Sequence, residues 1–318
     1  MKRTSAIAVF AFTAASALAA EYPAKPVRII TPFPPGGSVD LVARLIGADL
    51  SKPLGQQVVI DNRSGASGMI GTEVAKNAAP DGYTLLVNTL PFATSQFVYD
   101  KAPDPINDFA AVSLLCSVAS VLVAHPSLPV NSMKELIALA RSKPGAITYG
   151  TAGAASNPHI AGELLNQIAK IKLFAVHYKG GGPATIATLS GETQLYFVNS
   201  IPDALPQIQA KKLKPLGITA VRRNPAAPEI PTMAESGVPG YEFTTWQILA
   251  APKATPAPII STLNEKVRAT FRTPDAVKRW QDRGFDVIAS TPEEMTAHLQ
   301  REVKKWRVVF KEQGIKAE

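Results

Sequence analysis

Short runs rich in β-branched residues alternate with longer amphipathic stretches along this chain, and the alternation starts twice. The first round begins near residue 27 and the second near residue 121. Such alternation predicts strands connected by helices that cover both faces of a parallel sheet. No sequence repeat accompanies the second round, so we expect two sheets of one architecture rather than two copies of one sequence. The predicted fold class is α/β, with two open doubly wound sheets.

Apolar spacing and turn residues predict the individual elements. Ser132 and Glu135 form a capping-box pattern at the start of one helix. The expected strands are residues 27–31, 58–61, 83–88, 111–115, 121–124, 147–150, 173–176, 195–198, 215–219 and 246–250. The expected helices are 39–50, 69–78, 133–141, two that begin near 158 and 183, and two lined by apolar residues within 259–271 and 295–310.

A proline-rich stretch suggests where the chain passes between the two sheets. Residues 222–239 contain four prolines and little periodicity, so we interpret them as a crossover, after which the strand at 246–250 returns to the first sheet. Two open sheets joined by two crossovers would face each other across a cleft, and ligands bind such sheets at the carboxyl ends of the strands. The predicted domains are residues 20–116 with 240–318, and residues 117–239.

The N-terminus has the pattern of a secretory signal. Lys2 and Arg3 precede an apolar run over residues 6–18, and small residues close it. The run is shorter than the roughly 20 residues that span a bilayer, which argues against a membrane anchor. We therefore expect residues 1–19 to be a cleaved signal peptide and the protein to reach a bacterial periplasm. Cys116 is the single cysteine, so no internal disulfide framework is expected.

Charge and motifs exclude several classes of function. The formal net charge is +8, but the basic residues are dispersed rather than gathered on one arm or helix, so nucleic acid is not an expected partner. No G-x-S-x-G, phosphate-binding P-loop or G-x-G-x-x-G motif occurs. His159 and Glu163 have helical i,i+4 spacing, which we interpret as a pair near a helix start rather than a metal site. We expect no metal, no cofactor and no enzymatic activity.

Two Gly-rich loops carry the strongest functional signal, because each follows a predicted strand and leads into a helix. In the first loop, residues 31–38, Gly36 and Gly37 let a ligand approach the backbone, and Ser38 is interpreted as the N-cap. The second loop, residues 150–157, precedes Pro158 in a helical first turn. Amide groups and the dipole at a helix N-terminus bind anions. Either loop alone could be a tight connection, but their matching positions favour a carboxylate site.

Several motifs together resemble the Bug receptors, the solute-binding proteins of tripartite tricarboxylate transporters. The resemblance covers essentially the whole chain after the signal peptide, in residues 22–40, 54–56, 62–68, 79–86, 177–180, 204–208 and 255–258. It implies a type II periplasmic binding protein fold that closes over a carboxylate held largely by backbone amides and water.

The same resemblance implies a set of ligand-binding residues. This chain has Ala155 where members often carry glycine, and Asn199 where an acidic residue is frequent nearby; without that acid, an amino acid is a less favoured ligand. The implied ligand-binding residues are Pro34, Gly36, Gly37, Ser38, Asp40, Thr89, Leu90, Ser156, His159, Tyr178, Gly180 and Asn199.

The expected function is a periplasmic receptor that captures a small organic carboxylate between two domains. The ligand would be a mono- or dicarboxylate, aliphatic or aromatic, and the receptor, a monomer, would pass it to the membrane subunits of a secondary transporter. Two alternatives stay open from the sequence: a ligand-sensing subunit that signals to a membrane kinase, and a secreted hydrolase that acts in the cleft.

Overall fold

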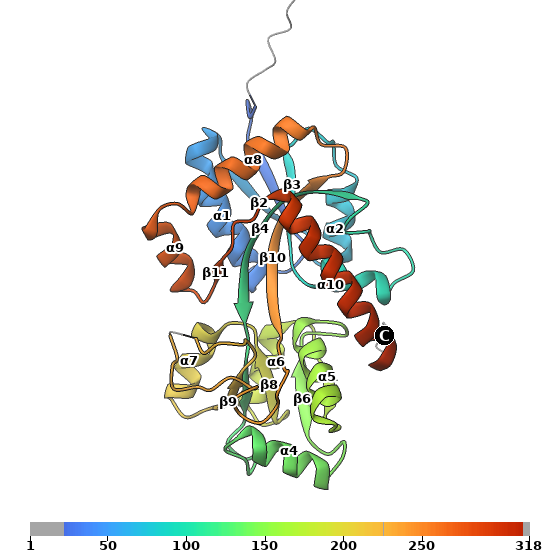
Figure 1. Ribbon diagram of the computed structural model, residues 1–318, viewed down its shortest axis with the longest axis vertical. Coiled ribbons are helices and arrows are strands. Elements are labelled where there is room, and N and C mark those ends of the chain that lie inside the picture. Colours follow the sequence, from blue (N-terminus) through green and yellow to red (C-terminus); the bar gives the residue numbers. More distant parts are fainter. Residues whose placement is uncertain (1–21, 225, 314–318) are drawn as a thin grey trace, which may run out of the picture.

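The computed structural model describes residues 22–224 and 226–313, which form two lobes (Figure 1). The predicted signal peptide, residues 1–19, lies outside the described residues. Each lobe is built around one sheet with helices on both faces, as the alternating sequence pattern predicts.

A mixed sheet of six strands forms the centre of the upper lobe in Figure 1. Its strands are β1 (Val27–Thr31), β2 (Val58–Asn62), β3 (Thr84–Asn88), β4 (Phe109–Ala119), β10 (Thr244–Pro252) and β11 (Asp286–Val287). Their order is β11-β4-β10-β3-β1-β2. β1 is parallel to β2 and β3, whereas β10 lies between β3 and β4 and is antiparallel to both.

The lower lobe contains a sheet of five strands with the same topology. Its strands are β5 (Val121–Ala124), β6 (Thr148–Thr151), β7 (Phe174–His177), β8 (Leu195–Val198) and β9 (Lys214–Ile218). Their order is β7-β6-β8-β5-β9, in which β5 is antiparallel to both of its neighbours. β10 and β5 thus occupy equivalent positions in the two sheets. The prediction of two sheets with one architecture is confirmed.

The strand-helix alternation predicts parallel strands, but β5, β10 and β11 are antiparallel to their neighbours, so both sheets are mixed. β5 continues β4 through Ser120, so it enters the lower sheet at the boundary between the lobes and runs away from it. β10 returns from the lower lobe and enters the upper sheet in the same way. A strand that arrives from the other lobe therefore runs opposite to its new neighbours.

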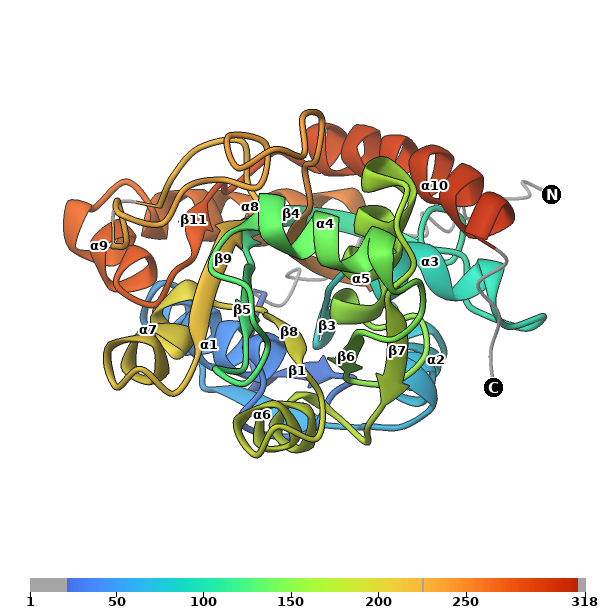
Figure 2. The same cartoon turned by 90° about the horizontal axis from the view of Figure 1, so that it is seen from below.

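Helices cover both faces of each sheet, and the apolar side chains beneath them form three clusters. Figure 2 shows α10 and α4 along one side of the molecule and α6 on the opposite side. On one face of the upper sheet lie α1 (Ser38–Leu54), α8 (Ala257–Thr270) and α9 (Pro274–Gln281), and on the other α2 (Met69–Lys76), α3 (Pro91–Thr94) and α10 (Pro292–Gln313). On one face of the lower sheet lie α4 (Met133–Ser142) and α5 (Asn157–Ala169), and on the other α6 (Gly181–Leu189) and α7 (Ile201–Gln209).

One apolar cluster extends through both lobes, and we call it the shared core. It includes Ile30 of the upper sheet, Phe197 of the lower sheet and Trp306 of α10. α10 packs against β4 and α3 of the upper lobe and against α5 of the lower lobe. At its C-terminal end Gln167 Nε2 donates to Glu312 Oε2 over 2.5 Å. The last helix therefore binds the two lobes together on one side.

The predicted element boundaries are mostly right to within a few residues. The capping box is confirmed, since the Glu135 amide donates to Ser132 Oγ, although the Glu135 carboxylate accepts from the amide of Asn131. β4 is 11 residues long rather than five because it continues to the boundary. Among the α-helices and strands of the described residues, four were not predicted: α3, α7, α9 and β11. The domain limits 20–116, 117–239 and 240–318 stay a prediction, and β4 ends at Ala119 while β10 starts at Thr244.

Two crossing segments connect the lobes, and hydrogen bonds hold them side by side. Thr219 Oγ1 accepts from the Ser120 amide at 2.9 Å and donates to the Ser120 carbonyl at 3.1 Å. The Thr219 amide also donates to that carbonyl, and Phe243 N–H donates to the Thr219 carbonyl. The lobes are therefore joined at a paired, hydrogen-bonded crossing.

Candidate ligand-binding site

The strand directions bring the carboxyl ends of both sheets to the boundary between the lobes. β4 ends at Ala119, directly before the crossing, and β1 and β3 run in the same direction as β4. β8 ends where the antiparallel β5 begins, so β6, β7 and β8 also end at the boundary. The loops that follow these strands, and the helix N-termini after them, therefore meet between the lobes.

The first Gly-rich loop exposes its backbone ahead of α1. Pro34, Gly36 and Gly37 are exposed, and Gly36 has a φ of 86° with open space where a Cβ would stand. The interpretation of Ser38 as N-cap is wrong: the helix begins at Ser38, and Gly37 is the N-cap. Within the described residues no side chain caps this N-terminus. The first amide groups of α1 are therefore available for an anion.

Asp40 supports this loop from beneath. Its buried carboxylate accepts from the Gly36 amide at 3.0 Å, from Arg44 Nε at 2.9 Å and from Asn62 Nδ2 at 2.9 Å. Burial opposes ionisation of Asp40, but the hydrogen bonds from Arg44, Gly36 and Asn62 outweigh it and hold the pKa of the carboxyl below its ordinary value. Asp40 thus orients the loop, and its negative charge is already balanced.

Asp40→Asn is expected to lower the free energy of unfolding by about 1–3 kcal/mol near neutral pH, because the new NH₂ group would face existing donors. A carboxyl with a lowered pKa in the folded state stabilises the fold above its unfolded pKa of about 3.9, and this contribution disappears as pH falls through the folded value. The difference between wild type and Asp40→Asn should therefore shrink on acidification. Urea unfolding at about pH 7 and about pH 3 checks this. A difference that stays constant with pH would contradict it.

The second Gly-rich loop makes a matching approach to α5. Ser156 is the N-cap, and its Oγ accepts from the Ala152 amide at 3.2 Å instead of capping the first turn. Ala155 has a φ of 56°, a left-handed conformation that costs a residue with a Cβ about 1–2 kcal/mol. This conformation explains why glycine suits position 155. Ser67 Oγ of the upper lobe lies 3.4 Å from the Ala154 carbonyl, so the second loop touches the opposite lobe.

His159 holds the second loop rather than supplying a positive charge. Its Nδ1 accepts from the Ala155 amide at 2.9 Å, and its ring lies 4.7 Å from that of His177. Burial and the neighbouring His177 lower the pKa of His159 to about 4, so the ring is neutral above that pH. Its Nε2 is 4.0 Å from Glu163 Oε1. In residues 22–224 and 226–313 no group of three or more His, Cys, Asp or Glu side chains is arranged to hold a metal ion.

Three further residues from the predicted set follow β7 and β8. Tyr178 Oη donates to Glu192 Oε1 at 2.8 Å, and burial, this hydrogen bond and the carboxylate raise the pKa of Tyr178 to about 12. Gly180 is the N-cap of α6, with a φ of 115° and open space at its Cβ position. Asn199 directly follows β8. All three lie after strands that end at the boundary.

Some buried polar atoms near these strand ends lack hydrogen-bond partners in the described part of the chain: Thr89 Oγ1, Asn157 Oδ1 and Asn199 Oδ1. Thr89 follows β3, whereas the side chain of Leu90 is completely buried in the shared core. Asn157, the first residue of α5, was not among the predicted residues. Its position in the sequence, at the end of the second Gly-rich loop and directly before Pro158, is the feature that indicates it as a candidate.

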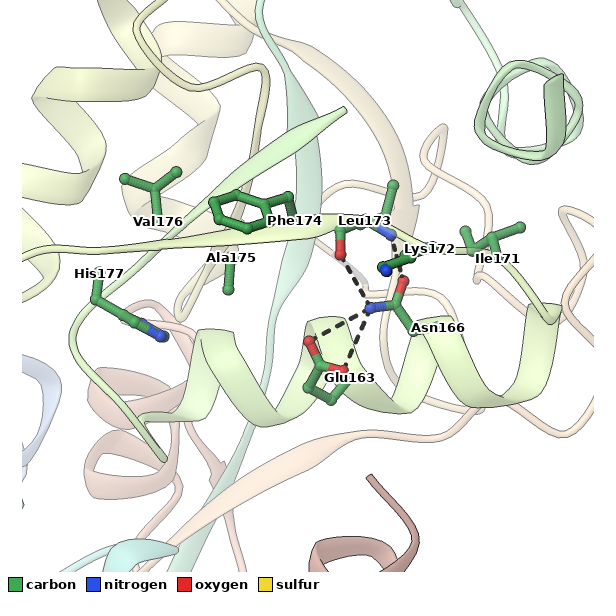
Figure 3. Close-up of a pocket in the computed structure, with 9 residues that line it drawn as sticks. All are labelled: Glu163, Asn166, Ile171, Lys172, Leu173, Phe174, Ala175, Val176 and His177. Carbon is green, nitrogen blue, oxygen red and sulfur yellow. Dashed lines mark hydrogen bonds between the residues drawn. The ribbon is translucent and has the colours of Figure 1, made fainter. Parts of the chain in front are cut away.

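A cavity of about 840 Å³ lies elsewhere, between α5 and the edge strand β7 (Figure 3). Glu163, which lines the cavity, accepts hydrogen bonds from Tyr149 Oη at 2.7 Å and from Asn166 Nδ2 at 3.3 Å. Figure 3 shows Asn166 between Glu163 and Leu173, bonded to both. These polar groups already satisfy one another, and neither Gly-rich loop contributes to the cavity wall.

Two sheets of one strand order, joined at a paired crossing and facing each other at their carboxyl ends, define a two-domain periplasmic binding protein fold. The family model described as tripartite tricarboxylate transporter family receptor matches residues 42–315. The chain belongs to this family of TctC, or Bug, receptors, which bind solutes and are not enzymes. Among the described helices, even the 22-residue α10 lacks the apolar stretch needed to cross a bilayer.

Relatives resemble the chain over nearly its whole length. Protein BugT of Bordetella pertussis is 34% identical over 306 residues, which are 95% of this chain and 94% of BugT. The structure of R. palustris Rpa4515 with adipate has a TM-score of 0.87 and 35% identity, and covers 93% of this chain and 99% of that one. MatC (Rpa3494) of Rhodopseudomonas palustris with bound malate has a TM-score of 0.82 and 32% identity, covering 91% and 99%.

Proposed function

We propose that this receptor binds a small organic carboxylate between its two domains and delivers it to the membrane subunits of a tripartite transporter. The observation that carries the proposal is the pair of helix N-termini, those of α1 and α5, which begin at the boundary from opposite lobes. Neither has a side-chain cap among the described residues. Their free amides and dipoles suit two carboxylate groups of one ligand.

In this proposal the predicted residues have two kinds of role. Asp40, His159 and Tyr178 keep the loops in place, because their polar groups are bonded to neighbouring protein atoms. The other predicted residues contact the ligand directly, and Leu90 does so through its backbone. The remaining members of this group are Pro34, Gly36, Gly37, Ser38, Thr89, Ser156, Gly180 and Asn199.

The ligands bound in two related structures support a dicarboxylate. Adipate and malate are both diacids, and they are bound by relatives at 35% and 32% identity. We propose a ligand of this size class for the present chain. Residues 1–19 would direct export, and the mature receptor would act as a monomer in the periplasm. Its first domain would consist of residues 20–116 and 240–318, and its second of residues 117–239. The two domains would close on the ligand.

Calorimetric titration of adipate, malate and the monoamide of each acid tests the proposal. At least one diacid should bind, and its monoamide should bind at least tenfold more weakly, because an amide NH₂ would face the helix amides. Affinity should change little between about 50 and 500 mM salt, since enclosed interactions are screened weakly. Equal affinity for acid and amide, or a steep decrease with salt, would contradict recognition by helix N-termini and favour an exposed cation such as Lys179.

Gly37→Val is expected to weaken diacid binding at least tenfold, or about 1.4 kcal/mol, with little loss of stability. A Cβ at position 37 would lie 3.7 Å from the Pro34 carbonyl oxygen and meet nothing closer, so the fold accommodates it. The added methyl groups would instead occupy the approach to the α1 amides. Gly37→Ala should give a smaller effect of the same sign. If Gly37→Val unfolds at the same temperature as wild type and binds the diacid with unchanged affinity, the first Gly-rich loop is only a connection between β1 and α1.

A further inference from the structure

The last helix exposes an unusual series of positive charges. Its outer side carries five exposed basic residues, which we call the cationic stripe: Arg301, Lys304, Lys305, Arg307 and Lys311. Helical spacing places them on the side opposite Trp306 and Phe310, both of which are buried in the shared core. From residue 301 to residue 311 the stripe extends about 15 Å along the helix.

The acidic groups of this part of α10 form their hydrogen bonds with residues outside the stripe. Glu302 Oε2 accepts from the indole nitrogens of Trp246 and Trp306, each at 2.9 Å. Glu312 accepts from Gln167. In the described ranges no member of the stripe forms a salt bridge. Lys305 and Arg307 lie over the rings of Trp306 and Phe97, which leaves their charges at the surface.

Folding alone does not account for this arrangement. Pairs such as Arg301 with Lys305, and Arg307 with Lys311, are like charges at i,i+4 spacing, which destabilise an isolated helix. The helix dipole favours cations only in the last turn, where Lys311 stands. The other members of the stripe thus repel one another without a salt-bridge partner among the described residues, and an anionic surface outside the protein would supply opposite charge.

The stripe continues toward the second lobe. The C-terminal end of α10 contacts α5 through Gln167 and Glu312 (Figure 1). Lys170 and Lys172, both exposed, follow Gln167 by three and five residues. The second lobe therefore adds two exposed cations close in sequence to the residue that contacts the C-terminal end of α10.

We propose that the cationic stripe holds the receptor against the anionic surface of a phospholipid bilayer. All five members of the stripe are exposed on one helix. Val308, 52% exposed, is the single exposed large apolar residue within the described segment 301–311. Flexible cations on one helix face fit a fluid layer of phosphate headgroups, for which exact geometry is not required. Each basic residue near such a surface strengthens binding about fivefold.

Vesicle flotation tests the proposal with the full mature chain. Wild-type protein should float with vesicles that contain phosphatidylglycerol and phosphatidylcholine, but not with phosphatidylcholine alone, and should dissociate when salt is raised from about 50 to 500 mM. Lys304→Glu with Lys311→Glu should weaken vesicle binding by about 30-fold or more. Diacid binding measured by calorimetry should not change, which separates this result from the carboxylate site.

A control with the same change in net charge distinguishes a specific face from overall charge. Arg268→Glu with Arg272→Glu alters two exposed residues at the end of α8, which lies on the opposite face of the upper sheet. This control should keep most of the vesicle binding. Equal losses in the two double variants would overturn the proposal, and so would the failure of wild type to bind anionic vesicles, a result that would instead favour an acidic protein as the partner.

Discussion

Trp306→Ala is expected to lower the free energy of unfolding by about 3–5 kcal/mol, the usual cost of removing a buried tryptophan. Trp306 is 1% exposed and its ring lies 5.8 Å from that of Phe243. Its indole N–H donates to Glu302 Oε2, which also accepts from Trp246. Truncation would open a cavity in the shared core and leave Glu302 with one partner fewer. Urea unfolding followed by circular dichroism measures the loss.

Trp306→Phe is the matched control because it keeps an aromatic ring and removes the N–H group. It should cost less than the alanine variant. Because the shared core belongs to both lobes, Trp306→Ala should also destabilise both in one transition. A cost below about 1 kcal/mol would show that α10 contributes little to the core.

Gly162→Ala is expected to destabilise the protein by about 3 kcal/mol, at the upper end of the effect of overpacking. A Cβ at position 162 would lie 2.3 Å and 2.4 Å from two ring carbons of Tyr149. Tyr149 is completely buried, and its hydroxyl donates to Glu163. The ring therefore has no free space to move into, and α5 would have to shift away from the lower sheet. Thermal and urea unfolding give the size of the effect.

Gly182→Ala provides the control, since it adds the same methyl group to a helical glycine. Position 182 is exposed and has nothing within 4 Å of the added carbon. This change should be neutral or slightly stabilising, because alanine favours helix. If the Gly162 and Gly182 variants unfolded alike, the close packing of α5 against Tyr149 would not limit stability.

Local patterns predicted most of the regular structure, and the exceptions have physical causes. α1 was recognisable from the spacing of Val42, Ile46 and Leu50, all of which are buried. α7 was missed because Pro202 and Pro206 break the usual helical pattern, although Pro202 lies in the first turn, where it is tolerated. β11 has only two residues and depends on pairing with β4, so no local sequence pattern predicts it.

The roles of the site residues were harder to predict than their positions. Both Gly-rich loops precede helices, as expected from their glycine and proline content. The part played by Asp40 depends on Asn62, which is 22 residues away in sequence and reaches it only after β1 and β2 pair. Hydrogen-bond partners that are distant in sequence decide whether an acid such as Asp40 contacts a ligand or supports a loop. Local sequence spacing does not reveal these partners.

The position of β10 affects the order in which the molecule can be assembled during synthesis. β3 and β4 do not pair with each other; both pair with β10, which comes from residues 244–252. A nascent chain that has emerged only as far as the end of β4 therefore has two open strand edges where the centre of its sheet belongs. The upper sheet can close only when the chain is complete to β10, after the whole second sheet has been made. A polypeptide with this connectivity therefore cannot complete its first sheet until late in translation.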